Sequence, residues 1–191
     1  MQLWDAVSGS HQKLLEGHSG RVNCVVFSLD GKYLLTGSND QTIKLWDAHT
    51  GGLLKTLQGH HYVTSIAISP SGDYVVAGLF NRTARLYRPW EERPAVHERQ
   101  FNGHDDEVTT VSISPDATII ASGSVDMSVW LWNAAMGDTF NQAGRKNNEQ
   151  LKGHSAPMNS IAFSNSGAFI VAGDEKETIH TCDNWIFIEE I

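Results

Sequence analysis

Hydrophobic and polar positions along the 191-residue chain follow one pattern that occurs four times. Each occurrence begins with a short run in which an apolar residue, two mostly polar residues and an apolar–any–apolar step lead to a closing Ser, as in Val22–Ser28. Each run predicts a buried β-strand. The corresponding runs are Val63–Ser69, Val108–Ser114 and Met158–Ser164.

Two further strands are predicted in each unit. A turn follows the first run, rich in residues that preset or tolerate turn dihedral angles. A second apolar run ends at a glycine, and a third run closes the unit. The spacing from the closing Ser to the Trp46 position is 18 residues in all four units, so no gap is needed inside any unit. The glycines are Gly37, Gly78, Gly123 and Gly173, and the third strands are expected at Thr42–Asp47, Thr83–Arg88, Ser128–Asn133 and Thr178–Asp183.

All variation in length falls between the third strand and the next unit, where loops and a more exposed fourth strand are expected. A Gly-His pair opens each unit, and the four histidines are 42, 44 and 50 residues apart. The longest connection, from Asn133 to His154, is predicted to be a long, mobile polar loop. Fourth strands are expected at Gln12–Leu15, Leu53–Leu57, His97–Phe101 and Trp185–Ile188.

The unit that opens with Gly17-His18 and closes with Leu45-Trp46-Asp47 resembles the tryptophan-aspartate (WD) repeat, and the resemblance covers essentially the whole chain. It implies an all-β WD-repeat β-propeller with four-stranded antiparallel blades. Rings of this family commonly have about seven blades, so the chain predicts an incomplete ring. Residues 1–191 are expected to form a single propeller segment, divided into the end of a partial blade at 1–15, repeats at 16–58, 59–101 and 102–152, and a degenerate repeat at 153–191.

Two explanations of the incomplete ring remain open at this point. The chain is a fragment of a larger propeller, or it completes its ring through self-association or another polypeptide. In both cases the end blades lack neighbours, and unpaired apolar faces and edges favour association. The residues expected to lack neighbours include Val22, Val26, Ile161 and Phe163.

His104, Ser122 and Asp126 have the composition of a hydrolase triad, but the trio recurs as His18, Thr36 and Asp40. A catalytic triad occurs once and needs an exposed nucleophile beside an oxyanion hole. The WD resemblance implies instead a structural hydrogen-bond chain from a Trp indole through the hydroxyl and the imidazole to the turn Asp. The two complete tetrads are His18, Thr36, Asp40, Trp46 and His104, Ser122, Asp126, Trp132.

The second and fourth units depart from this tetrad. Ala77 and Ala172 remove the hydroxyl, and Lys176 replaces the acceptor carboxylate with a donor. The chain of hydrogen bonds therefore cannot form there as it does in the complete units. These two blades are expected to be the less stable ones.

Composition narrows the possible partners. A formal net charge of −8 leaves no broad basic field, so neither nucleic acid nor a membrane surface is an expected partner. No secretory signal or membrane-spanning run is found, and two cysteines suggest a reducing compartment, so an intracellular location in cytoplasm or nucleus is expected. No His, Cys or carboxylate set has metal-ligand spacing, and phosphate-binding Gly-rich loops are absent. We expect no metal, no cofactor and no catalytic residues.

The leading hypothesis is a non-catalytic scaffold that binds other proteins or peptides on one face of the propeller. The resemblance implies the face where the loop before each first strand meets the turn between the second and third strands. Tyr62 and Phe80 are the preferred anchors, because aromatic side chains desolvate at low cost and offer a large contact area. The partner-binding candidates are Arg21, Asn39, Tyr62, Phe80, Glu107, Val125 and Glu175.

Other functions remain open. The chain is alternatively a propeller domain or fragment of a larger multidomain protein whose catalytic or signalling domain lies outside these residues. An adaptor role in ubiquitin ligation gains no support, because Trp46-Asp47-Ala48-His49 lacks the Arg of the Trp-Asp-x-Arg pattern. Trp90 is either an exposed anchor for a partner or a residue packed under its own loop.

Overall fold

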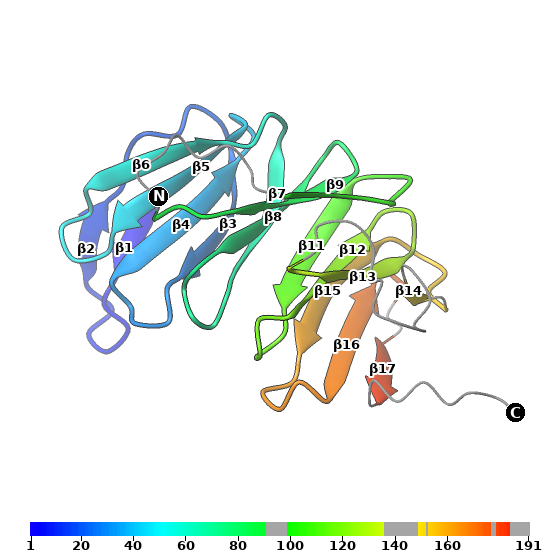
Figure 1. Cartoon of the computed structure of the whole chain (residues 1–191). Coiled ribbons are helices and arrows are strands. Elements are labelled where there is room, and N and C mark those ends of the chain that lie inside the picture. Colours follow the sequence, from blue (N-terminus) through cyan, green and yellow to red (C-terminus); the bar gives the residue numbers. More distant parts are fainter. Residues whose placement is uncertain (91–98, 136–148, 152, 177–178, 184–191) are drawn as a thin grey trace, which may run out of the picture.

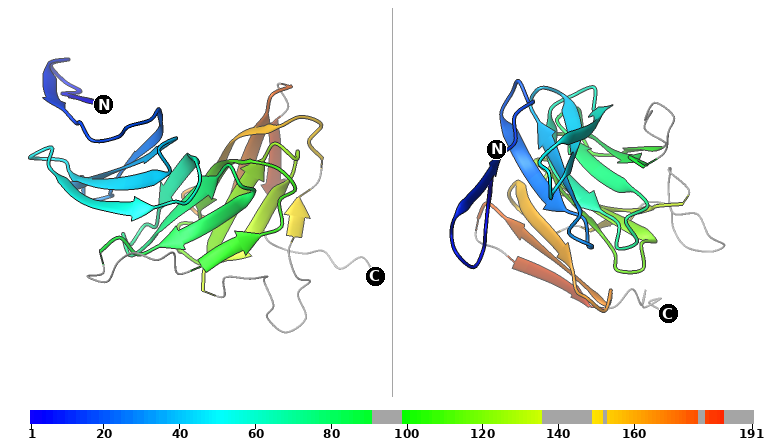
Figure 2. Two further views of the ribbon diagram at one scale, coloured as in Figure 1. Left: turned by 90° about the horizontal axis from the view of Figure 1, so that it is seen from above. Right: turned by 90° about the vertical axis from the view of Figure 1, so that its left-hand side faces the viewer.

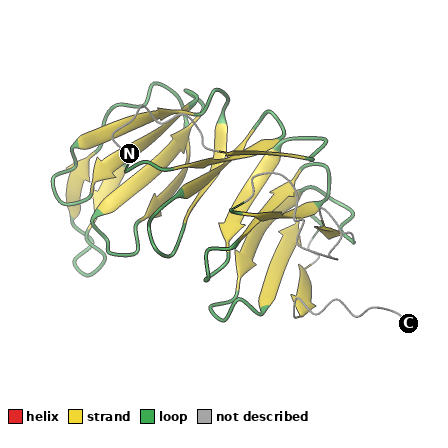
Figure 3. Ribbon diagram, viewed as in Figure 1, coloured by secondary structure: helices red, strands yellow, loops and turns green. Residues whose placement is uncertain are grey.

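The computed structural model describes residues 1–90, 99–135, 149–151, 153–176 and 179–183. Every regular element in these ranges is a β-strand (Figure 3). The strands form four antiparallel sheets, here called blades 1 to 4, and one additional strand pair. The pair is β1 (Gln2–Trp4) with β2 (His11–Leu14), and blade 1 is β3 (Val22–Phe27), β4 (Tyr33–Ser38), β5 (Thr42–Asp47) and β6 (Leu53–Gln58).

The other blades repeat this order of strands. Blade 2 is β7 (Val63–Ile68), β8 (Val75–Leu79), β9 (Thr83–Tyr87) and β10 (Arg99–Asn102). Blade 3 is β11 (Val108–Ile113), β12 (Ile119–Ser124), β13 (Val129–Asn133) and β14 (Glu149–Leu151). Blade 4 is β15 (Met158–Phe163), β16 (Phe169–Asp174) and β17 (Ile179–Asp183).

The first strands β3, β7, β11 and β15 are neighbours in that order, so the blades follow one another along an open arc (Figure 1, Figure 2). Hydrophobic clusters lie between consecutive blades, where one sheet packs on the next. The predicted all-β architecture of antiparallel propeller blades in an incomplete ring is confirmed.

The prediction for the connection between Asn133 and His154 was incomplete. The structure places β14 in this stretch, where it pairs with β13 and completes blade 3. The strand has only three residues and no alternating pattern, which explains why the sequence did not indicate it. The candidate fourth strand Trp185–Ile188 lies outside the described residues.

Consecutive blades pack through a close approach at the glycine of each second strand. A Cβ on Gly78 would come within 2.9 Å of Val108 Cγ1 and 3.3 Å of Val111 Cγ1, both in the next blade. A Cβ on Gly123 would come within 3.0 Å of the Met158 Cβ. Glycine is required at these positions because the aliphatic residues of the next first strand occupy the space of a side chain. Gly37 meets Val63 and Ile66 in the same way.

A polar contact accompanies each glycine contact. Asn23 Nδ2 donates to the Val63 carbonyl at 2.8 Å, and Thr64 Oγ1 donates to the Val108 carbonyl at 2.5 Å. Thr109 Oγ1 donates to the Met158 carbonyl at 2.5 Å. The second residue of each first strand therefore hydrogen-bonds to the first residue of the next first strand. We call the glycine contact and this hydrogen bond together the interblade contact.

The expectation about unpaired apolar residues holds for Val22, which is partly exposed where its counterparts Val63, Val108 and Met158 are fully buried, and is wrong for the other three residues. Val26 and Phe163 pack against interblade clusters, and Ile161 is buried. Side chains alternate between the two faces of a strand, so the exposed residues of β3 are the neighbours of Val26. Val25 and Phe27 are exposed in blade 1, and Phe169 and Val171 are exposed in blade 4.

Candidate functional site

Two hydrogen-bond tetrads hold the loops that form one end of the blades. In blade 3, Trp132 Nε1 donates to Ser122 Oγ at 2.8 Å, and Ser122 Oγ lies 2.8 Å from His104 Nε2. His104 Nδ1 lies 2.9 Å from the Asp126 carboxylate. Asp126 also accepts a hydrogen bond from the Asp105 backbone N–H, which ties the loop before β11 to the turn after β12. Blade 1 has the same chain, with 2.9 Å from Trp46 to Thr36, 2.6 Å from Thr36 to His18 and 2.7 Å from His18 to Asp40.

The electrostatics of the blade 3 tetrad favour one direction of donation. Burial lowers the pKa of His104, although the Asp126 carboxylate opposes this shift. Burial alone raises the pKa of Asp126, but hydrogen bonds from Ser128 and Asp105 and the nearby His104 lower it below its ordinary value. A neutral imidazole with a proton on Nδ1 donates to Asp126 and accepts from Ser122, so every group in the chain is satisfied. Ser122 has no exposed surface and offers no nucleophile to a substrate.

Blades 2 and 4 lack the full tetrad. In blade 2, Ala77 leaves no hydroxyl between strands, and His60 is exposed. In blade 4, His154 Nδ1 lies 3.1 Å from the carboxylate of Asp174, and both side chains are buried. The sequence-based expectation missed this partner, which precedes Lys176 by two residues. The sequence did carry a signal for this partner. Asp174 follows Gly173 directly, at the position where blades 1 and 3 have Ser38 and Ser124.

The loops before the first strands and the turns after the second strands meet, as the resemblance implied, and we call the surface they form the top face. In each blade a turn N–H donates to a loop carbonyl at 2.9 to 3.0 Å. All seven predicted partner-binding residues belong to these pairs, and Pro157 is the one member not predicted. The pairs are Asn39 with Arg21, Phe80 with Tyr62, Val125 with Glu107, and Glu175 with Pro157.

A groove of about 510 Å³ lies in the top face. The structure places five predicted residues in its lining and leaves Val125 and Glu175 outside it. The second residues of the four first strands also line it, and sequence reasoning missed them. The sequence signal for these lining residues was a polar residue directly after the first apolar residue in each of the four first-strand runs. The lining is Arg21, Asn23, Asn39, Tyr62, Thr64, Phe80, Glu107, Thr109 and Asn159.

Tyr62 and Phe80 form an exposed aromatic pair at this groove. Their ring centroids are 5.7 Å apart, and the side chains are 44% and 53% exposed. Arg21 contributes a cation from blade 1, whereas Glu107 from blade 3 follows two further acids. Burial, with a smaller contribution from Asp106, raises the pKa of Glu107. The groove thus combines an apolar anchor with groups of both charges.

Trp90 is not part of the top face. Its indole N–H donates to the Gly72 carbonyl, and its ring centroid is 4.8 Å from that of Tyr33. It therefore packs between blades 1 and 2, at the turns between their first and second strands.

Two further features of the described ranges concern metals and membranes. No three His, Cys, Asp or Glu side chains gather there as a potential metal site. Within the same ranges, no helical segment has the length and apolarity to cross a membrane.

Radial antiparallel sheets joined by one repeated contact define the class of protein as a β-propeller of repeated blades. The family model "WD domain, G-beta repeat" matches residues 9–47, 51–88, 96–133 and 145–183. The chain belongs to this family of WD-repeat proteins.

Three relatives illustrate the range of similar proteins. The chain is 33% identical over 125 residues to the WD repeat domain-containing protein 83 homolog of Dictyostelium discoideum, covering 65% of the chain and 38% of that protein. It is 34% identical over 170 residues to the guanine nucleotide-binding protein subunit beta of Solanum tuberosum, covering 84% and 44%. It is 26% identical over 193 residues to the human kinesin-like protein KIF21A, covering 96% and 11%. The chain thus spans less than half the length of each.

Proposed function

We propose that this chain is a protein-interaction scaffold that binds an extended segment of a partner protein across the groove of the top face. The observation that carries this proposal is the exposed Tyr62–Phe80 pair at the groove. Aromatic residues are enriched among interface anchors, because they bury a large area at a small cost in conformational entropy. Family membership supports the scaffold role, since WD-repeat proteins are generally non-catalytic scaffolds.

The lining of the groove indicates the chemistry of the partner segment. An apolar side chain of the segment would pack against Tyr62 and Phe80. Arg21 favours a carboxylate at one end of the segment, and Glu107 favours a basic side chain at the other. Asn39 and Asn159 supply amide groups that can hydrogen-bond to an extended backbone.

A non-catalytic role is part of the same proposal. The arrangement of His104, Ser122 and Asp126 that has triad composition lies inside blade 3, where Ser122 is fully buried. The second candidate is a propeller portion of a larger protein with its own catalytic or signalling domain. The observation that favours it is the small share of each relative that the chain covers.

The test is affinity capture from cell extract with the wild-type chain and the Tyr62→Ala/Phe80→Ala variant. A matched control, Leu29→Ala/Leu54→Ala, removes two exposed apolar side chains away from the top face. A partner retained by the wild type and the control but lost by the aromatic variant is then purified for binding measurements. We expect its affinity to fall at least about tenfold for the aromatic variant, as truncation of interface anchors typically costs 1 kcal/mol or more. Equal binding by all three proteins would refute the proposed site.

A further inference from the structure

Blade 2 carries the aromatic pair of the top face but lacks the tetrad that holds the corresponding loops of blades 1 and 3. In those two blades, the loop histidines His18 and His104 bond to an Asp of the turn. His60 of blade 2 is exposed, and its backbone φ of 65° lies in the left-handed region. Asn81, at the position of the turn Asp, accepts a hydrogen bond from Thr83 at 2.7 Å. The loop of residues 59–62 is therefore held in another way.

Arg85 lies inside blade 2 on the face that carries the tetrad in other blades. It pairs in register with Ala77, whose counterparts Thr36 and Ser122 supply the tetrad hydroxyl, and directly opposite residues share one face of a sheet. Arg85 is only 8% exposed. Burial raises the pKa of the Tyr87 hydroxyl, at the position of the tetrad Trp, to about 12, although the nearby Arg85 guanidinium opposes the shift. The guanidinium thus lies on the side of the blade that the missing hydroxyl leaves open.

The guanidinium of Arg85 reaches the loop before β7. Arg85 Nη1 donates to the Gly59 carbonyl at 3.2 Å. The Gly59 N–H donates to the Gln41 carbonyl of blade 1 at 2.8 Å, so both backbone groups of this glycine are hydrogen-bonded. In blade 3 an aromatic ring supports the equivalent glycine, since a Cβ on Gly103 would come within 2.9 Å of the Trp132 ring. The three atoms nearest to the same point on Gly59 are two backbone oxygens and a valine methyl group, so hydrogen bonds take over this support.

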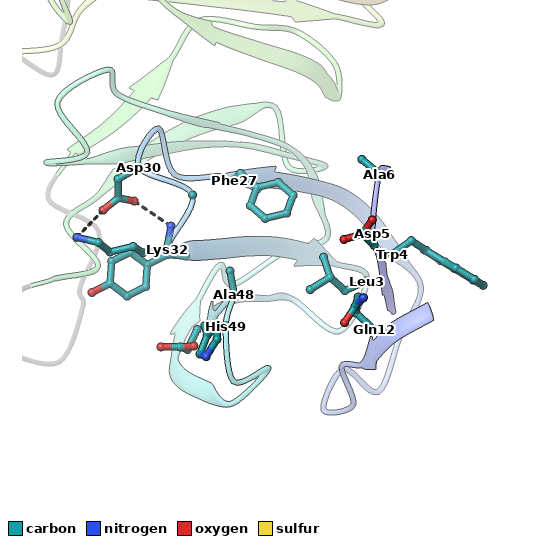
Figure 4. A pocket seen from close by; sticks show the side chains of 13 residues that line it. Leu3, Trp4, Asp5, Ala6, Gln12, Phe27, Asp30, Lys32, Ala48 and His49 are labelled. Carbon is teal, nitrogen blue, oxygen red and sulfur yellow. Dashed lines mark hydrogen bonds and ion pairs between the residues drawn. The ribbon is translucent and has the colours of Figure 1, made fainter. Parts of the chain in front are cut away.

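The charge of Arg85 is not compensated in the part of the chain that the structure describes. No acid there forms an ion pair with it, and its Nε is buried without a hydrogen-bond partner. By contrast, the exposed Lys32 of blade 1 pairs with Asp30 at 3.4 Å (Figure 4). Lys44, which occupies the Arg85 position in blade 1, donates to Thr56 of the outer strand rather than to a loop. A buried cation without an anion is unfavourable for the fold alone, which indicates a role in placing the loop.

We propose that Arg85 is the positioning residue of the aromatic pair: its hydrogen bond to Gly59 fixes the loop of residues 59–62 and thereby holds the Tyr62 ring against Phe80. The loop closes on its turn through the bond from the Phe80 N–H to the Tyr62 carbonyl at 3.0 Å. Without Arg85 the loop opens more often, and a partner that binds the pair must first order it, which weakens binding. The statement about binding rests on the proposed function, whereas the statement about the loop does not.

The test is residue-resolved amide hydrogen exchange of the full chain as wild type, Arg85→Met and the matched control Lys44→Met, which removes an equally buried cation from blade 1. The Phe80 N–H reports closure of the blade 2 loop, and the N–H groups of Asn39 and Val125 report the same closure in blades 1 and 3. We expect Arg85→Met to accelerate exchange at Phe80 about tenfold and to leave the other two amides unchanged, because a hydrogen bond from a charged donor is lost in blade 2 alone. Lys44→Met should leave all three amides unchanged, since the tetrad holds the blade 1 loop.

Urea unfolding of the same proteins separates positioning from a purely structural role. Met removes an uncompensated buried charge, so we expect Arg85→Met to be at least as stable as the wild type. A purely structural Arg85 would instead lower the stability and accelerate all three amides together.

A partner identified by affinity capture adds a binding measurement. We expect Arg85→Met to weaken its binding about threefold, because the aromatic side chains then lose more freedom on binding. Unchanged exchange at Phe80, equal acceleration of all three amides, or failure of Arg85→Met to fold would overturn the proposal. A partner lost by Tyr62→Ala/Phe80→Ala but bound at full affinity by Arg85→Met would overturn the positioning role and leave the proposed function intact.

Discussion

Replacement of Asp126 by Ala tests whether the blade 3 tetrad stabilises the fold. The carboxylate accepts four hydrogen bonds: from His104 Nδ1 at 2.9 Å, Asp105 N at 2.8 Å, Ser128 N at 2.9 Å and Ser128 Oγ at 2.5 Å. The Asp105 N–H is exposed and can bond to water instead. The buried groups of His104 and Ser128 cannot, and a buried group left without its partner costs about 1–3 kcal/mol.

Three donors of these residues lose their acceptor: His104 Nδ1–H, the Ser128 N–H and the Ser128 hydroxyl. His104 Nδ1–H can donate instead to Ser128 Oγ, which lies 3.2 Å away, so two donors remain unpaired and the expected loss is roughly 2–6 kcal/mol in the free energy of unfolding. Asp116→Ala is the matched control. Its carboxylate accepts two hydrogen bonds from Thr118 in an exposed turn, where water can replace them, and one from the buried hydroxyl of Ser114. Because one buried donor loses its acceptor here and two do in Asp126→Ala, we expect a smaller loss of about 1–3 kcal/mol.

The assay is urea unfolding of the folded variants, monitored by tryptophan fluorescence and by circular dichroism. Trp132 belongs to the tetrad and contributes to the emission together with the other five tryptophans of the chain, so the fluorescence includes the loss of blade 3 structure. Equal destabilisation by Asp126→Ala and Asp116→Ala would refute the reasoning, because it would mean that the buried imidazole finds another partner at no cost.

The remaining predictions concern blade 4 and the response to pH. Asp174→Ala should destabilise the chain more than Lys176→Ala in urea unfolding, because it leaves the buried His154 without its carboxylate, and equal effects would contradict this. Stability should fall as pH drops below about 6.5, since His104 in the unfolded chain gains a proton that the folded chain, with its lowered pKa, does not bind. The lowered pKa of Asp126 adds stability that is present above about pH 4 and is lost as pH falls through the folded pKa. A His104→Gln variant should lose the first of these two phases in unfolding measured across pH, and its retention would exclude His104 as the cause.

The repeated pattern was sufficient to predict the blades, because strand period, turn chemistry and glycine positions agree in all four units. It was not sufficient to assign strand faces. Val25 and Val26 are adjacent residues of the same type, yet Val25 is exposed and Val26 packs on blade 2. A bulge after Val22 shifts the register of β3, and this local irregularity decides which residue faces which neighbour.

The top face was predictable from the repeat pattern, because its loops and turns belong to single units. The groove was not predictable from that pattern. Each loop and its turn are brought together by the unit itself, so one repeat is enough to place Tyr62 next to Phe80. The groove depends on how successive blades are placed around the arc. Thr64 and Thr109 line it because they reach across to the next blade, which is a property of pairs of units.

The interblade contact also bears on how such a chain can lengthen. Each unit carries the glycine that receives the following first strand and the aliphatic pair that fits the preceding glycine. A tandem duplication of one unit would therefore produce a blade that already fits both of its new neighbours, with no compensating substitutions. Duplication of a segment that is not a whole number of units would separate a glycine from its aliphatic partner. Gene duplications are thus expected to be tolerated in steps of one blade.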